Sequence, residues 1–132
     1  MQAAIAVAIS LHLLAGIFWA GTTFAVARTG GTGGMRLYRP QQWAAVIAVL
    51  AGAYLWSVLR PEGTTGIILG IGALCAIAAA GVQGAMAGRS IRAFRNGALS
   101  EEKAQEQVLV AQRIAALLLG ATIVCMGIAR YT

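Results

Sequence analysis

Residues 3–27 read AAIAVAISLHLLAGIFWAGTTFAVA, a continuous apolar stretch that contains no charged residue. A helix of about 20 apolar residues crosses the hydrocarbon core of a bilayer, so this stretch is long enough to span a membrane. Three comparable stretches follow further along the chain. We therefore predict an all-α, integral membrane four-helix bundle that forms a single domain over residues 1–132, with helices at about 3–27, 42–59, 66–88 and 101–129.

The overall composition agrees with this prediction. Hydrophobic residues make up 59% of the chain and charged residues only 11%, whereas a soluble domain carries about 25% charged residues. The four predicted helices use most of the 132 residues, so we expect no soluble domain within them.

The formal net charge of +6 is concentrated in two of the predicted connections, 28–41 and 89–106. Since cytoplasmic loops are enriched in lysine and arginine, we expect both connections to be cytoplasmic and both termini to lie outside an inner cell membrane. A basic inner rim is typical of contact with anionic lipid head groups. The charge therefore predicts the bilayer as partner and not a nucleic acid.

Local signals define the predicted helix ends and packing. The glycine-rich segment 29–34 predicts a flexible linker, and Pro40 is expected to precede the second helix. Ser100 is a good N-cap for the fourth helix. Small residues, which allow helices to approach closely in lipid, are frequent in 66–88. We expect that helix to be central in the bundle or to line a cavity for a flat cofactor.

His12 is the only histidine of the chain, and it lies within the first apolar stretch. Ionisable residues at membrane depth are costly and are generally functional. His12, Gly16, Trp19 and Thr23 follow steps of four, three and four, so they share one helix face. Three uses of His12 remain open: a ligand of haem iron, a copper ligand beside soft Cys or Met donors such as Met126, or a hydrogen bond to a neighbouring helix.

A second polar set is predicted nearer the cytoplasmic side. Thr23, Gln83 and Arg113 are expected at similar distances from the cytoplasmic ends of their helices. The fourth helix is expected to enter the membrane only at about residue 107, and no acidic residue lies within the apolar spans 3–27, 42–59, 66–88 and 107–129. Arg113 therefore either extends to the interface or binds Gln83, a helix C-terminus or an anionic group such as a haem propionate.

Two short patterns in the first half of the chain match a known arrangement. One is Leu-His-Leu-Leu-Ala at 11–15, followed by Phe-Trp-Ala-Gly at 18–21, and the other is Ala-Gly-Ala-Tyr-Leu-Trp at 51–56. Through these patterns the chain resembles the copper-resistance D (CopD)-like membrane proteins. The first pattern is also similar to the first helix of HemJ, a protoporphyrinogen oxidase of the haem pathway, whose first-helix histidine is implicated in haem binding. The resemblance implies that His12 is an axial haem ligand.

The leading functional hypothesis is a membrane-embedded protein that binds haem b and acts in electron transfer or redox sensing. Copper binding or transport is the alternative, and a cofactor-free structural or lipid-binding subunit is the third. One histidine per chain predicts a homodimer or higher oligomer, or a second ligand such as Met126, Met86 or an outside molecule. Electron transfer implies a redox partner. The predicted cofactor-binding residues are His12, Gly16, Trp19, Thr23, Gln83 and Arg113, and the predicted metal ligands are His12 and Met126.

Overall fold

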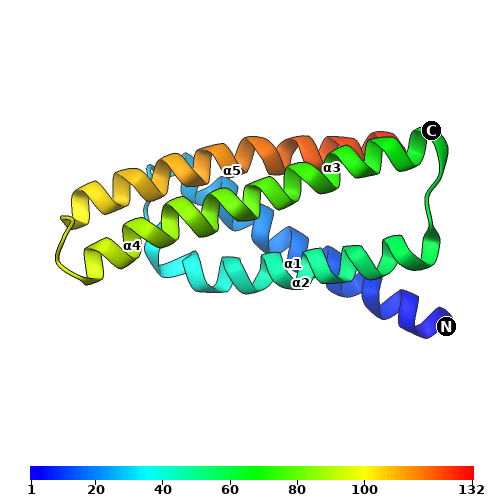
Figure 1. Cartoon of the computed structure of the whole chain (residues 1–132), viewed down its shortest axis with the longest axis horizontal. Coiled ribbons are helices and arrows are strands. Elements are labelled where there is room, and N and C mark those ends of the chain that lie inside the picture. The colour runs from blue at the N-terminus through cyan, green and yellow to red at the C-terminus, as the bar shows by residue number, and fades with distance from the viewer.

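The computed structural model describes residues 1–132 and contains helices but no strands (Figure 1). Four helical segments are long and apolar enough to cross a membrane, which confirms the predicted all-α four-helix bundle. The third of these segments, residues 63–95, is divided into three parts by a turn of π-helix. The elements are α1 (Gln2–Arg28), α2 (Gly34–Leu59), α3 (Gly63–Val82), the π-helical η1 (Gln83–Ala87), α4 (Gly88–Arg95) and α5 (Glu101–Ala129).

The bundle is built from two helix pairs, α1 with α2 and α3 with α5 (Figure 1). Both chain termini and the connection 60–62 lie at one end, which we call the terminal end. The connections 29–33 and 96–100 lie at the opposite, arginine-rich end, which we call the basic end. Although α2 and α3 are consecutive, they have few contacts, and the two pairs diverge towards the terminal end (Figure 1).

The second helix begins at Gly34 and not at residue 42, so the predicted connection 28–41 shrinks to residues 29–33. Gly33 adopts a left-handed conformation with φ of 77° at the start of α2, which a residue with a side chain adopts at a cost. Pro40 consequently lies inside α2 and not before it. Proline removes one backbone hydrogen bond of the helix. In α2 the carbonyl that lacks this donor is that of Arg36, in the first turn of the helix near the basic end.

The third span also extends further than predicted, because its helix continues through η1 and α4 to Arg95. A π-helical turn carries an additional residue and is often found at functional positions. The side chains of α4 are therefore rotated relative to those that a regular helix would present. Ser100 caps α5 as predicted, its hydroxyl accepting a hydrogen bond from the backbone amide of Lys103 at 3.3 Å.

The central helix is α5 and not the third span. In its most apolar window 39% of the residues are buried, against 11% in the window of residues 63–95. Alanines of α5 at 104, 111 and 115 are completely buried, because this face meets the other helices. Small residues of α3 such as Ala78 and Gly81 instead lie on its exposed face, so their presence did not identify the centre of the bundle.

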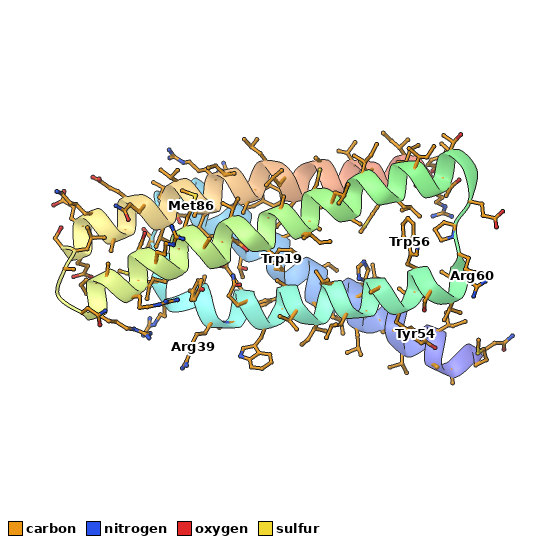
Figure 2. All side chains as sticks on the ribbon, viewed as in Figure 1. Trp19, Arg39, Tyr54, Trp56, Arg60 and Met86 are labelled. Carbon is orange, nitrogen blue, oxygen red and sulfur yellow. The ribbon has the colours of Figure 1, made fainter.

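The apolar core is restricted to the middle of the bundle and its basic half. One buried cluster surrounds Trp19, Ala45, Ala79 and Leu119, and a second is formed by Ala87, Ile91, Val108 and Ala111. No comparable cluster of buried apolar residues occurs in the terminal half. There Trp56 extends from α2 towards α3 (Figure 2) and lies beside Gly70.

Candidate functional site

A hydrogen-bonded polar cluster lies in the basic half, and its centre is Gln83 at the start of η1. The Gln83 side-chain oxygen accepts a hydrogen bond from Trp19 Nε1 at 2.6 Å. Its amide nitrogen donates to Thr23 Oγ1 at 2.9 Å and to Gln112 Oε1 at 3.1 Å. One side chain of η1 is thus bonded to both α1 and α5.

Gln41 brings α2 into the same cluster. Gln112 Nε2 donates to Gln41 Oε1 at 2.8 Å, and Gln41 Nε2 donates back to Gln112 Oε1 at 3.3 Å. Gln41 also donates to Thr22 Oγ1 at 3.1 Å. The three glutamines, with Trp19, Thr22 and Thr23, form what we call the glutamine cluster, and it connects all four membrane-spanning segments.

The glutamine cluster is sealed and internally paired. Gln41, Gln83, Gln112 and Thr23 are 0% exposed, and every side-chain amide group among them has a partner. The one buried side-chain nitrogen or oxygen without a partner is Nε2 of Gln42, on the adjacent residue of α2. Since amides and hydroxyls neither gain nor lose protons near neutral pH, the cluster has no acid–base chemistry of its own and instead joins the helices.

His12 lies apart from this cluster, on the terminal side of the core. Its Nδ1 is 2.7 Å from the carbonyl oxygen of Ala48 on α2. A carbonyl only accepts hydrogen bonds, so Nδ1 carries a proton, and in the corresponding neutral tautomer Nε2 is the unprotonated nitrogen. Gly52, one turn further along α2, permits this approach, because a Cβ there would lie 3.0 Å from His12 Cε1.

The Nε2 atom of His12 has no hydrogen-bond partner in the protein. Nε2 is also not a fully buried atom, so it is accessible from outside the packed core. Gly16, one turn away on the same face, is half-buried and has no atom within 4 Å of the position that a Cβ would occupy. The bundle is therefore open beside Gly16.

The predicted site residues fall into three places. Trp19, Thr23 and Gln83 meet in the glutamine cluster, as the proposed second polar set anticipated for Thr23 and Gln83. His12 and Gly16 share the face of α1 with Trp19, but they lie outside the cluster. Arg113 is exposed on α5, and its Nε lies 3.5 Å from the carbonyl oxygen of Ala27 near the C-terminus of α1.

The candidate soft donors have exposed side chains. Met126 is 41% exposed on α5, and Met86 is 37% exposed in η1 at the basic end (Figure 2). No group of three or more His, Cys, Asp or Glu side chains is positioned to hold a metal ion.

Sequence reasoning missed Gln41 and Gln112, which complete the glutamine cluster. Gln41 falls one residue before the predicted start of the second helix, so it was assigned to a loop. Gln112 stands next to Arg113, whose charge is the more conspicuous signal. The usable signal is that each is an uncharged polar residue on an otherwise apolar helix, which favours an interhelical hydrogen bond.

Two surface hollows accompany these sites. An open apolar groove of about 600 Å³ lies between α1 and α2 in the terminal half and is lined by residues such as Val7, Leu11, Leu50 and Tyr54. A smaller hollow of about 110 Å³ lies between α2 and α4 at the basic end and is lined mostly by polar residues. Neither hollow includes His12.

Fold and site together define a helical membrane-protein class, a four-span bundle with one accessible histidine and a sealed amide cluster. No family model matches the chain, and no curated protein and no solved structure is significantly similar to it. The resemblance to CopD-like proteins therefore rests on residues 11–21 and 51–56 alone. Both of these segments border the contact between His12 and α2.

Proposed function

We propose that this chain binds haem b in the membrane, with His12 Nε2 as an axial ligand of the iron. The single observation that carries the proposal is the hydrogen bond between His12 Nδ1 and the carbonyl of Ala48. Histidines that ligate metals almost always donate their second ring nitrogen to a carbonyl or carboxylate, which fixes the tautomer and makes the ligating nitrogen more basic. His12 has this arrangement, and its Nε2 is free.

The surroundings of His12 suit a neutral imidazole ligand. The first span has no charged residue, and the nearest contacts of the ring are a backbone carbonyl and Gly52. Gly16 leaves space beside the ring on the same helix face. We assign haem contact to His12 and Gly16, whereas Trp19, Thr23 and Gln83 support the helix from the glutamine cluster and Arg113 stays at the surface.

One histidine per chain supplies one axial nitrogen, so a low-spin haem requires a second ligand. We propose that a second copy of the chain provides it, in a homodimer with one haem for two chains. Haem supplies a one-electron exchange between ferric and ferrous iron, which suits electron transfer or redox sensing with a separate partner. The residues of this chain would bind the iron, exclude water and set the basicity of the ligand.

The test is a visible absorption spectrum of the detergent-purified protein, oxidised and then reduced with dithionite. We expect a Soret band with sharp reduced α and β bands, and one haem for two chains by pyridine haemochrome and protein assay. His12→Ala should lose these bands, and free imidazole should restore them by occupying the space of the lost ring. Leu11→Ala, which changes the adjacent exposed residue, is the matched control and should keep the spectrum.

A colourless wild-type protein from cells supplied with haem would overturn the proposal. Metal analysis of the same sample then separates the remaining functions: bound copper that is lost in His12→Ala indicates a copper protein. Absence of both groups, with His12→Ala changing only stability, indicates that the bond to Ala48 is structural. Haem retained in His12→Ala would place the ligand elsewhere.

A further inference from the structure

The basic end carries a hollow that the haem proposal does not use. It lies between α2 and α4 and is lined by Tyr38, Arg39, Gly88, Ile91, Arg92 and Arg95. Gly88 and Ile91 are buried, whereas the three arginines are exposed. The hollow therefore combines a packed floor with a rim of three guanidinium groups.

No carboxylate neutralises this rim. The four acidic residues of the chain are Glu62, in the connection at the terminal end, and Glu101, Glu102 and Glu106 on α5, and none lines the hollow. Three positive charges with no acidic partner in the hollow repel one another, and an anion between them removes that repulsion. Guanidinium groups hold phosphate oxygens in a bidentate geometry, so phosphate is the anion that this side-chain set favours.

The floor is built to admit Tyr38. A Cβ at residue 88 would lie 2.6 Å from the Tyr38 hydroxyl oxygen, so only glycine permits this contact. The same hydroxyl is 3.4 Å from the carbonyl oxygen of Gly84, a long hydrogen bond that leaves its lone pairs available. Tyr38 thereby fixes α2 against the start of α4 and adds a polar group to the floor.

The helix register gathers the arginines at this hollow. Gly88, Ile91, Arg92 and Arg95 follow steps of three, one and three, and thus lie on one face of α4. The π-helical turn at 83–87 directly precedes this segment and sets the face that α4 turns towards α2. Arg39 extends outward from α2 at the same end of the molecule (Figure 2).

We propose that this hollow binds a phosphate group, and specifically the phosphodiester of an anionic lipid head group. The hollow lies at the end of the bundle where the membrane interface begins, and basic pockets between spanning helices are typical sites for anionic lipid head groups. Arg92 and Arg95 hold the phosphate oxygens and Arg39 closes the rim, while the Tyr38 hydroxyl keeps its hydrogen bond to Gly84 O and forms part of the floor. Free phosphate has the same oxygen chemistry and is the competing source.

The experiment is native mass spectrometry of the detergent-purified protein, titrated with phosphatidylglycerol, phosphatidylcholine or inorganic phosphate. We expect phosphatidylglycerol to bind, and the double variant Arg92→Gln/Arg95→Gln to weaken binding about 25-fold, since each arginine near an anionic lipid contributes roughly a factor of five. Arg28→Gln/Arg89→Gln is the matched control, because it removes the same charge from exposed residues at the same end. Its affinity should equal that of the wild type, and circular dichroism should show that both variants stay helical.

A charge-conserving variant tests the geometry. Arg92→Lys/Arg95→Lys keeps both positive charges and removes the bidentate forks, so we expect at least about threefold weaker binding. Equal weakening by the pocket pair and the control pair would overturn the proposal in favour of diffuse surface charge. Binding of inorganic phosphate with the affinity of the lipid, or equal binding of phosphatidylcholine, would overturn the assignment to an anionic lipid.

Discussion

The two halves of this bundle are held together in different ways. In the basic half, the glutamine cluster joins all four spans and two apolar clusters fill the space around it. In the terminal half, α1 contacts α2 through the bond from His12 to Ala48, and α3 contacts α5 through Thr122, whose hydroxyl donates to Gly72 O at 2.9 Å. The terminal half thus consists of two helix pairs, whereas the basic half is one four-helix unit.

The difference between the two halves follows from how helices associate in a membrane, where the hydrophobic effect does not bring them together. Lipid is as apolar as leucine, so helices associate through close packing and interhelical hydrogen bonds. The basic half has both kinds of interaction across all the helices, and the terminal half has them only within pairs. We therefore expect the basic half to be the stable unit and the terminal half to be the part that can open around a bound group.

The largest expected effect comes from breaking the glutamine cluster. Gln83→Leu removes three interhelical hydrogen bonds, at about 0.6 kcal/mol each, and should lower the free energy of unfolding by about 2 kcal/mol. Reversible unfolding in mixed micelles measures this change. The control Gln2→Leu alters an exposed glutamine and should be close to neutral. Equal free energies of unfolding for the two variants would mean that the glutamine cluster does not make the basic half more stable than the terminal half.

Alanine substitutions at two glycines compare the packing of the basic half with the packing beside His12. A Cβ at Gly34 would lie 2.9 Å from Val108 Cγ1, so Gly34→Ala overpacks the basic half and should cost about 1–2 kcal/mol. Gly16, beside His12, has no atom within 4 Å of such a Cβ. Gly16→Ala should therefore stabilise the helix by about 0.5–1 kcal/mol. Thermal unfolding of the cofactor-free protein compares them, and a shift of the same sign in both would contradict the difference in packing.

The smallest effect is expected in the terminal half. Thr122→Val keeps the shape of the side chain but removes the hydrogen bond to Gly72 O, and should cost about 0.6 kcal/mol. Hydrogen exchange should quicken in α3 and α5 near these residues and remain unchanged around Gln83. An equal increase around the glutamine cluster would show that the two halves unfold as one.

Much of the fold could be read from the sequence, because hydropathy identifies spans and capping residues identify ends. The four spans and the Ser100 cap are confirmed. The early start of α2 was missed because Pro40 was interpreted as a boundary, although a helix tolerates the loss of one bond near the interface. The π-helical turn was missed because one additional residue per turn leaves the hydropathy of a span unchanged.

The candidate site was only partly predictable from the sequence, because periodicity and depth do not fix the rotation of each helix. The shared face of Trp19 and Thr23 follows from helical periodicity, and their meeting with Gln83 follows from depth. Neither argument reveals which polar residue bonds to which, since that depends on the rotation of each helix. The rotation of α5 buries Gln112 and directs Arg113 outward, although the two are consecutive.

The burial of Trp19 gives the molecule an optical property. Its indole is 3% exposed and hydrogen-bonded within the core, whereas Trp43 and Trp56 are 69% and 42% exposed. Brominated lipid chains, which quench fluorescence on contact, would therefore extinguish the emission of two tryptophans and spare the third. The remaining fluorescence would come from Trp19 in the glutamine cluster, so this tryptophan is an intrinsic reporter of the most stable region of the chain.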